Sequence, residues 1–397
     1  MIKKRKICFV LNSRANYGRV KNLLILLNKK KNIDLKIVLG ASSLLYKFGD
    51  ITNQIKRDGL KVSEKFYSIV EGENLLTMTK SAGLTIIELS DIFKNIKPDI
   101  VVVLADRFEN LPVAICASYM NIPLAHIQGG EVTGSIDEKV RHSITKLSDI
   151  HFASTERSKK YIINMGENKK KVFNTGCPSI DIAKDINMKI DNKFFNNIGV
   201  GNKIKNNDKY IVILQHPVTT EIKSTKLQID ETIKSIKYIC EKEKVKALWF
   251  WPNVDAGTDI ISRKLRSFRE NLKPDYITFV KNLSPEKYLK VLFNSQCFIG
   301  NSSSGIREGS YLGIPYVNIG NRQKNREKGK NVIDVGYSNK EIIKAIRTQL
   351  QKKRYKRETI YGKGNSSKLI SELLVRLPLT YEKVLNYIKW LKKFFII

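Results

Sequence analysis

Short apolar runs alternate along this chain with longer stretches of helical periodicity. In the first half the runs are KICFVL, LKIVLG, DIVVVLA, PLAHIQ, DIHFAS and KVFNTG, and in the second they are YIVILQ, KALWFW, YITFV, CFIG and PYVNIG. Strands that are hydrophobic throughout, rather than at every second position, are typical of parallel sheets covered by helices on both faces. The pattern therefore predicts an α/β protein with parallel strands joined by helical crossovers.

This strand and helix pattern occurs twice. Between its two copies, residues 184–208 are rich in Asn, Lys and Asp and lack periodicity, which indicates a boundary. A chain of 397 residues also exceeds what one hydrophobic core usually holds. We therefore predict two Rossmann-like doubly wound domains facing a cleft, one over 1–185 completed by a terminal helix over 376–397, the other over 186–375. In such sheets, the residues that follow each strand meet the ligand.

The composition is that of a folded protein, with 42% hydrophobic and 27% charged residues. The net charge of +33 can accompany binding to nucleic acid, anionic membranes or phosphorylated ligands. Lysine is, however, spread along the whole chain with asparagine and isoleucine, without a compact basic arm or an aromatic-basic signature. We attribute the charge to general composition and expect no nucleic-acid partner.

Cysteine spacing and hydropathy indicate a cytoplasmic protein. The cysteines lie far apart without a CxxC pair, so we expect reduced thiols rather than a zinc site or a redox dithiol. The N-terminal MIKKRKICFVLNSR begins like a signal peptide, but its apolar part is short and runs directly into polar residues. No apolar stretch approaches the roughly 20 residues that span a bilayer, so we expect no stable membrane insertion.

The stretch GNSSSG, residues 300–305, joins the run CFIG to the helical IREGSYL. A helix that starts at a strand end presents backbone N–H groups to an anion, and Ser302 and Ser303 can add hydroxyl donors to a diphosphate. Glu308 would repel a diphosphate, so the neutral diol of a ribose suits its carboxylate better. The alternative is that a serine caps the helix and Glu308 favours its dipole. We favour a nucleotide, with Arg322 of the next basic loop as its phosphate partner.

Two strand ends in the first half carry charged side chains. Arg14 follows KICFVL and is placed to reach a phosphate, although no GxGxxG follows this strand, which argues against a tightly held dinucleotide. The run DIVVVLA delivers Asp106 and Arg107 to the cleft, where the alternative is an exposed ion pair.

The stretch GGEVTGSIDEKVRH begins a further helix. SIDE matches a capping box, so Ser135 and Glu138 can cap each other's backbone while Asp137 favours the first turn. Both acids also stand at helical pairing distances from Arg141. Spacing alone therefore makes neither of them catalytic.

Of the four histidines, only His216 directly follows a strand. It lies in YIVILQHPVTTE, where Pro217 ends the strand ladder and leaves the ring at the cleft mouth. A second ligand at metal-binding spacing is not evident, so we expect no metal and assign His216 to phosphate contact or proton transfer.

Several long motifs, including LADRFENLPVA, HIQGGEVTGSIDEKVRHSITKL, QHPVTTE, PNVDAG, IGNSSSGIREG and GNRQKNRE, together carry a family resemblance. From about residue 5 to about residue 370 the chain resembles the hydrolysing UDP-N-acetylglucosamine 2-epimerases, including the epimerase half of the bifunctional animal enzyme. The resemblance implies the two-domain fold of type B glycosyltransferases and a reaction without a cofactor.

In the reaction that this resemblance implies, UDP and the C2 proton are eliminated to give 2-acetamidoglucal. Water then adds, and UDP and N-acetylmannosamine are released. Because C2 is not next to a carbonyl, departure of UDP must lead. Stabilising the leaving diphosphate is therefore a main catalytic task for helix N-termini, serines and arginines.

The resemblance also implies roles for individual residues. Asp106 and Asp137 match the acid/base carboxylates, and His216 matches the essential histidine. Glu131 and Glu138 are reserve carboxylates. The positions that match substrate contacts are Arg14, Arg107, Gln128, Asn253, Ser302, Ser303, Gly305, Glu308 and Arg322.

Two positions depart from the family pattern. Many relatives carry a catalytic glutamate in HIEGG, whereas this chain has HIQGG with Gln128, whose amide cannot accept the C2 proton. Either Asp106, Glu131 or Asp137 takes that role, or the sugar is different. Asn282 stands where the animal enzyme has a histidine near the uracil.

The first expected substrate is UDP-N-acetylglucosamine, in the biosynthesis of sialic-acid-like sugars. The nearest alternative is UDP-2,4-diacetamido-2,4,6-trideoxyglucose, the substrate of relatives in legionaminic acid synthesis. A glycosyltransferase with a separate acceptor and a non-catalytic UDP-sugar-binding protein are two further alternatives. The resemblance also implies a homo-oligomer, either a dimer or a tetramer.

Overall fold

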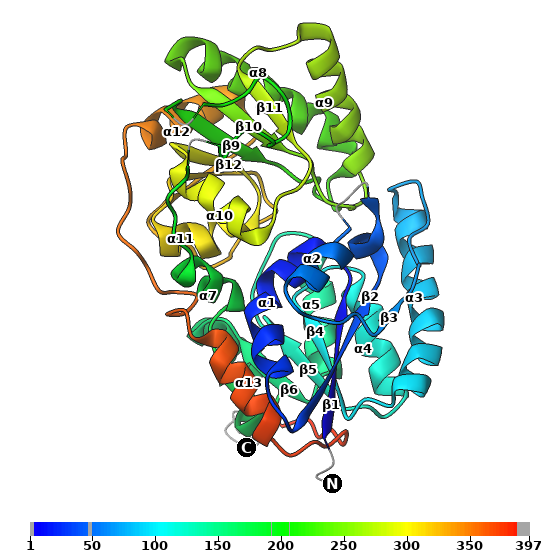
Figure 1. Cartoon of the computed structure of the whole chain (residues 1–397). Coiled ribbons are helices and arrows are strands. Elements are labelled where there is room, and N and C mark those ends of the chain that lie inside the picture. The colour runs from blue at the N-terminus through cyan, green and yellow to red at the C-terminus, as the bar shows by residue number, and fades with distance from the viewer. Residues whose placement is uncertain (1–3, 47–49, 192, 206, 387–397) are drawn as a thin grey trace, which may run out of the picture.

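Two seven-stranded sheets organise the chain into two lobes (Figure 1). The computed structural model describes residues 4–46, 50–191, 193–205 and 207–386. The strand orders are β3-β2-β1-β4-β5-β6-β7 in the first lobe and β14-β13-β12-β9-β10-β11-β8 in the second. All neighbouring strands are parallel except β8, which runs antiparallel to β11. The predicted fold, two doubly wound parallel sheets, is confirmed.

The first lobe contains β1 (Arg5–Leu11), α1 (Arg14–Asn28), β2 (Ile33–Leu39), α2 (Thr52–Arg57), β3 (Glu64–Lys65), α3 (Leu75–Ile96), β4 (Ile100–Leu104), α4 (Asn110–Tyr119), β5 (Leu124–Ile127), α5 (Asp137–Leu147), β6 (Ile150–Ala153), α6 (Glu156–Asn164), β7 (Val172–Asn174) and α7 (Pro178–Asp185). The second contains β8 (Val200–Gly201), β9 (Tyr210–Leu214), α8 (Thr225–Glu243), β10 (Lys246–Phe250), α9 (Thr258–Leu272), β11 (Ile277–Val280), α10 (Pro285–Asn294), β12 (Cys297–Gly300), η5 (Ser303–Gly305), α11 (Arg307–Leu312), β13 (Tyr316–Ile319), β14 (Val332–Val335) and α12 (Asn339–Leu350).

Helices on both faces of each sheet explain the continuous apolar runs. In β1, Ile7 and Phe9 pack in a core with α1, whereas Cys8 and Val10 pack on the opposite face with α3 and α4. Residues 7–11 of β1 are therefore all buried, and the alternation of polar and apolar positions disappears. The second sheet likewise separates two cores.

The last helix of the described chain, α13 (Ser366–Arg376), returns to the first lobe and packs against α1 (Figure 1). Arg5 of β1 donates hydrogen bonds to the carbonyls of Leu374 and Leu377, at 2.6 and 2.9 Å. This helix ends at Arg376, because Pro378 disfavours helical structure at the residue before it, and the helix expected over 376–397 is not present over its described part. Residues 377–386 have no helix, and residues 387–397 lie outside the described part.

A domain division near residue 185 remains our proposal. The helix α7, which ends there, lies between the lobes and contacts α1 and α13 as well as α10 and α11. With α13 assigned to the first lobe, the chain crosses between lobes twice. Among the described residues, no helix is long and apolar enough to cross a membrane.

Candidate active site

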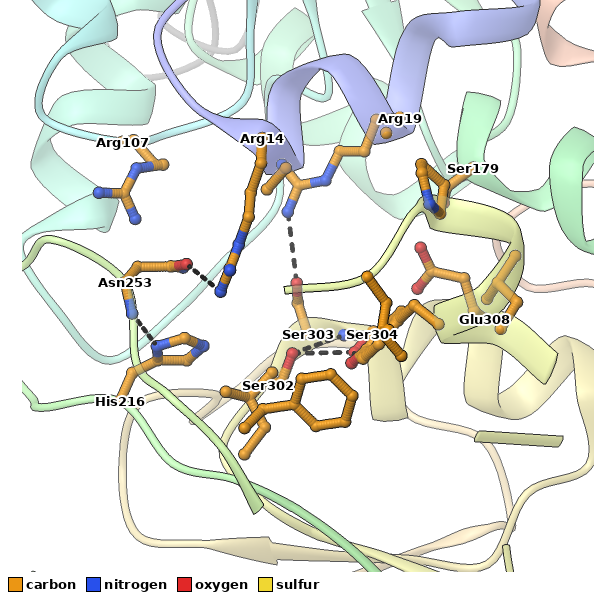
Figure 2. A pocket seen from close by; sticks show the side chains of 18 of the residues that line it. Arg14, Arg19, Arg107, Ser179, His216, Asn253, Ser302, Ser303, Ser304 and Glu308 are labelled. Carbon is orange, nitrogen blue, oxygen red and sulfur yellow. Dashed lines mark hydrogen bonds between the residues drawn. The ribbon is translucent and has the colours of Figure 1, made fainter. Parts of the chain in front are cut away.

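A cavity between the lobes contains about 1230 Å³ of empty space, part of it open to solvent. Its wall includes residues that follow strands of both sheets, the position where ligands of such sheets bind, together with residues of α1, α7 and α10. Figure 2 shows side chains that line it. The cavity brings together most of the predicted site residues: Arg14, Asp106, Arg107, Asp137, His216, Asn253, Ser302, Ser303, Glu308 and Arg322.

The serine turn after β12 is surrounded by hydrogen-bond donors. Ser302 caps η5, as the alternative interpretation had it, and its hydroxyl lies 2.9 Å from the Ser304 hydroxyl. The Ser303 hydroxyl accepts hydrogen bonds from Arg19 at 3.5 Å and from Arg307 at 3.2 Å. Capping and anion binding are therefore compatible here, because two guanidinium groups stand beside the same turn.

Glu308 follows the serine turn in the chain and lies in the first turn of α11 (Figure 2). Its Oε2 atom is buried and has no hydrogen-bond partner among the described residues. A buried carboxylate oxygen without a donor is costly unless a ligand supplies one. The hydroxyl groups of a ribose would do so, in agreement with the role expected for Glu308.

The turn itself depends on a glycine. Gly300 has φ of 132°, and a Cβ atom there would lie 2.0 Å from the Leu214 carbonyl oxygen. Only glycine therefore lets β12 end so close to β9 before the serines begin.

Asn301, which was not singled out from the sequence, connects three strand ends. Its side chain accepts a hydrogen bond from the His216 N–H at 2.7 Å and donates to the His216 carbonyl at 2.8 Å. Its own carbonyl accepts from Arg322 at 3.2 Å and from Gln323 at 2.9 Å. One buried residue thus fixes the segments that follow β9, β12 and β13 relative to one another.

His216 is held as a neutral donor at the cavity wall. The backbone N–H of Asn253 donates to its Nδ1 atom at 3.2 Å, so the ring proton resides on Nε2 (Figure 2). Burial, together with Arg322, Arg107 and Arg14, holds the pKa of His216 well below its usual value. An Nε2–H group suits contact with a phosphate oxygen.

Arg14 and Arg107 both reach from the first lobe to the second. Arg14 donates to the Lys281 carbonyl at 2.7 Å and lies 3.5 Å from Asn253 Oδ1, and burial lowers its pKa to about 10. Arg107 pairs with Glu109 at 2.9 Å and, across the lobes, with Asp255 at 3.1 Å. The alternative of an exposed ion pair at Arg107 is therefore wrong, because the pair is buried.

The two predicted acid/base carboxylates have opposite electrostatic environments. Burial would raise the pKa of Asp106, but Arg141, in contact with it, and Arg326, at 3.5 Å, help to hold that pKa well below its usual range. Burial and the negative charge of Asp106 raise the pKa of Asp137, although Arg322 lies 3.5 Å away. Carboxylates whose pKa values are driven apart suit different roles in proton transfer.

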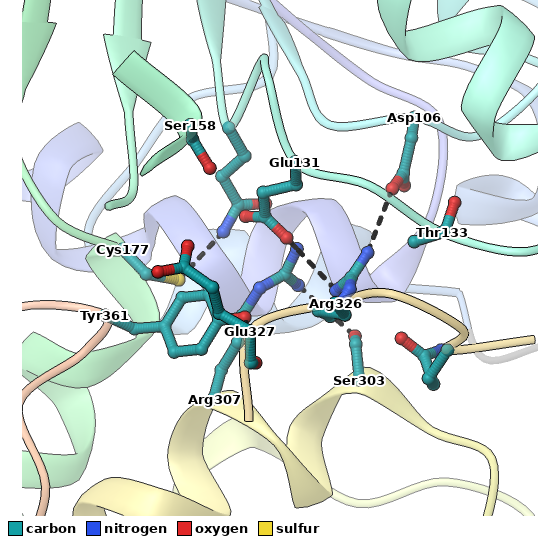
Figure 3. Close-up of polar contacts among 12 residues, drawn as sticks. Asp106, Glu131, Thr133, Ser158, Cys177, Ser303, Arg307, Arg326, Glu327 and Tyr361 are labelled. Atoms are coloured by element: carbon teal, nitrogen blue, oxygen red, sulfur yellow. Dashed lines mark hydrogen bonds and ion pairs between the residues drawn. The ribbon is translucent and has the colours of Figure 1, made fainter. Parts of the chain in front are cut away.

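The reserve glutamates do not line the cavity. Glu131 pairs with Arg307 at 2.7 Å and Arg326 at 3.2 Å, and although burial opposes ionisation these charges lower its pKa to about 2 (Figure 3). Glu138 accepts hydrogen bonds from the Thr133 N–H at 2.7 Å and from Arg141 at 2.9 Å. Both side chains are occupied by structural partners. The predicted pairing of Glu138 with Arg141 is confirmed. The predicted capping box is wrong, because Ile136 is the N-cap of α5 and Glu138 accepts from the Thr133 N–H instead of the Ser135 N–H.

Gln128 and Gly305 also lie away from the cavity, contrary to their assignment as substrate contacts. The amide of Gln128 donates to the Cys177 sulfur at 2.8 Å, and Gln128 does not line the cavity. At Gly305 a Cβ atom would lie 2.5 Å from the Tyr316 ring, so this glycine serves close packing.

Further polar side chains at the cavity were missed from the sequence. The clearest is Arg19 on α1, whose Nη1 atom is buried without a hydrogen-bond partner among the described residues. The other polar residues at the wall are Gln54, Ser179, Asn282, Tyr288, Ser304, Gln323 and Arg326. Asn282 alone had been noted, as a departure. Among the residues that the structure describes, no group of three or more His, Cys, Asp or Glu could hold a metal ion.

Comparison with known proteins points in one direction. The family described as UDP-N-acetylglucosamine 2-epimerase matches residues 26–375. A Legionella pneumophila protein named UDP-N,N'-diacetylbacillosamine 2-epimerase (hydrolyzing) is 32% identical over 96% of this chain and 98% of its own length. An Escherichia coli protein named polysialic acid biosynthesis protein P7 is 35% identical over 86% of this chain and 85% of its own length.

Solved structures agree in fold. A UDP-GlcNAc 2-epimerase from Neisseria meningitidis, bound to UDP-GlcNAc, superposes with a TM-score of 0.75 at 21% identity, covering 94% of this chain and all of its own. A UDP-GlcNAc 2-epimerase from Methanocaldococcus jannaschii, in complex with UDP-GlcNAc and UDP, gives 0.77 at 21% identity over 93% and 99%.

Proposed function

Because the chain belongs to the UDP-N-acetylglucosamine 2-epimerase family, we propose that it converts a UDP-2-acetamido sugar and water to UDP and the free C2 epimer. One observation carries this proposal. One cavity contains two carboxylates, Asp106 with a lowered pKa and Asp137 with a raised pKa, beside a serine turn that arginines contact. The first feature suits proton transfer at C2, and the second suits a leaving diphosphate.

In the first step the C1–O bond to the diphosphate breaks, and UDP leaves with the bonding electrons. The donors placed for the new negative charge are the Ser302 hydroxyl, the Arg19 guanidinium and the Nε2–H group of His216. Donors that are already fixed stabilise such charge without reorganisation. Glu308 is proposed to hold the ribose.

The C2 proton leaves as the double bond between C1 and C2 forms. We assign its removal to Asp137, because a raised pKa makes the ionised carboxylate a stronger base, and because the amide of Gln128 is not a base and does not line the cavity. Asp106 remains ionised among its arginines, and its negative charge suits the positive charge that develops at C1. Water then adds to C1, and a proton arrives on the other face of C2.

Two sugars are proposed as substrates. UDP-N-acetylglucosamine is supported by the name of the family and of a Neisseria meningitidis relative that is 27% identical over 91% of this chain. UDP-N,N'-diacetylbacillosamine, the diacetamido sugar considered above, is supported by the name of the Legionella relative. The reaction at C1 and C2 is the same for both.

The test offers each UDP-sugar separately in heavy water and follows UDP release, the identity of the free sugar and deuterium at C2. We expect one sugar to give its free epimer with deuterium at C2, and His216→Ala to give none while remaining folded. No turnover of either sugar would contradict the proposal, as would transfer that requires an added acceptor. Sialic-acid-like sugar synthesis, cytoplasmic location and assembly as a dimer or tetramer stay predictions.

A further inference from the structure

His126 is buried in the first lobe and does not line the cavity. It lies in β5, is 0% exposed, and stands in register with Val103 of β4 on one side and His151 of β6 on the other. A histidine in the centre of a parallel sheet occupies a position that an aliphatic side chain usually fills. Its polar ring therefore needs partners.

Both ring nitrogens of His126 have one. Nε2 lies 2.8 Å from the Ala105 carbonyl oxygen, and Nδ1 lies 3.2 Å from the Thr145 hydroxyl. Because a carbonyl oxygen can only accept, Nε2 carries the proton, and Nδ1 accepts from Thr145. Burial lowers the pKa of His126 to about 3, so the ring stays neutral in this one tautomer.

The first partner belongs to a strained turn. Ala105 has φ of 57°, in the left-handed region, which costs a non-glycine residue roughly 1–2 kcal/mol. Its N–H donates to the Ile127 carbonyl at 2.8 Å, so residues of β5 hold both the N–H and the carbonyl of Ala105. The next residue is Asp106, and the turn at Ala105 directs its side chain to the cavity.

The second partner belongs to the helix of the other acid. Thr145 lies on α5, which begins at Asp137 and also carries Arg141, the arginine in contact with Asp106. The contact leaves no room for a side chain at Gly129, where a Cβ atom would lie 2.8 Å from His126 Nδ1 and 2.9 Å from Thr145 Oγ1.

We infer that His126 is a positioning residue for the proton-transfer pair Asp106 and Asp137. Its ring connects the turn at Ala105, which precedes Asp106, to the helix α5, which begins at Asp137. This inference rests on the proposed 2-epimerase function. It assigns no contact with substrate to His126. The consequence is that loss of its contact with Ala105 lowers the rate of the chemical step while leaving UDP binding intact.

The test compares two amide replacements of similar polarity. The amide of glutamine reaches about as far as Nε2 and can still donate to Ala105, whereas that of asparagine reaches only to the place of Nδ1. We expect H126N to lower kcat by about 100-fold, the effect of a displacement of about 1 Å, and H126Q to stay within about tenfold of wild type. The UDP dissociation constant, measured by calorimetry, should match wild type in both variants.

A second measurement does not depend on turnover. Amide hydrogen exchange over residues 101–109 should be faster in H126N than in wild type and close to wild type in H126Q. If H126N does not fold, T145V and T145S replace the pair, with the hydroxyl kept only in T145S. Equal kcat and equal exchange in the two members of the pair would overturn the inference.

If the wild-type protein turns over neither UDP-N-acetylglucosamine nor UDP-N,N'-diacetylbacillosamine, the proposed function fails. The exchange measurement then still decides whether His126 holds the turn before Asp106.

Discussion

Asp137 is the residue whose surroundings give the clearest prediction about pH. Its pKa is raised, so the ionised form that can accept a proton is populated only above that raised value. We expect kcat/KM to fall as pH decreases through a value above the usual aspartate range. Asp137→Asn should lower kcat by about 10²–10⁴-fold, the usual contribution of a general base, with UDP binding retained.

The same substitution, Asp137→Asn, should lower kcat but raise the stability of the folded protein at alkaline pH. A raised pKa means that the folded state gains stability when Asp137 is protonated, and that this gain is lost as pH rises through the raised pKa. The melting temperature of Asp137→Asn should therefore exceed that of wild type at pH 8 and match it at pH 4. Asp230→Asn, at a partly exposed ion pair with Lys264, is the control. A lower melting temperature at pH 8 would contradict the proposed cause.

For single residues, a position directly after a predicted strand was the sequence signal that identified cavity residues. It placed Asp106, His216 and Ser302 correctly at the cavity, because strand ends are visible in the sequence. Arg19 and Arg326 could not be found in this way, because their burial depends on how the two lobes meet. Gln128 follows a strand as well, but it turns toward Cys177 through a left-handed φ of 70°.

At the scale of elements, Asn301 joins the segments that follow β9, β12 and β13 at the cavity. Asn301→Ala would leave the buried N–H and carbonyl of His216 without these partners, at about 1–3 kcal/mol for each unsatisfied group. We expect the melting temperature to fall by several degrees and kcat to fall with it, since His216 loses both hydrogen bonds to the Asn301 side chain. The hydrogen bond from Arg322 goes to the backbone carbonyl of residue 301 and is kept in the variant. Asn271→Ala, on an exposed part of α9, should match wild type. An Asn301→Ala protein with normal melting and turnover would remove this role.

Strands could be predicted from the sequence where their side chains are buried on both faces of the sheet. Every apolar run became a strand, whereas β3, β8 and β14 were missed because they are short, lie at a sheet edge and are at least partly exposed. The stretch 184–208, expected only as a boundary, contains β8. Such edge strands form through pairing with a neighbour that sequence periodicity does not reveal.

At the scale of the molecule, buried ion pairs join the two lobes. Glu131 of the first lobe pairs with Arg307 and Arg326 of the second (Figure 3). Removing one partner of a buried pair costs about 3–5 kcal/mol, because the remaining charge stays buried. Glu131→Gln should therefore lower the melting temperature and, by X-ray scattering, increase the radius of gyration without ligand.

We expect UDP to reverse part of both changes in Glu131→Gln, since a diphosphate supplies negative charge beside the same arginines. Glu243→Gln, which breaks a surface pair with Arg347, is the matched control and should behave like wild type. If the two variants behave alike, the pairs of Glu131 do not hold the lobes together.

The return of α13 to the first lobe has a consequence for synthesis. The surface of α1 that α13 covers is complete only after residue 376 has been made, although the rest of that lobe ends near residue 185. At roughly 5–20 residues per second, the ribosome needs about 10–40 seconds for the segment between them. During that time Leu23 and Leu27 border an apolar face that lacks its cover. A nascent chain stalled before residue 366 therefore lacks the helix that covers this face of α1 in the finished protein.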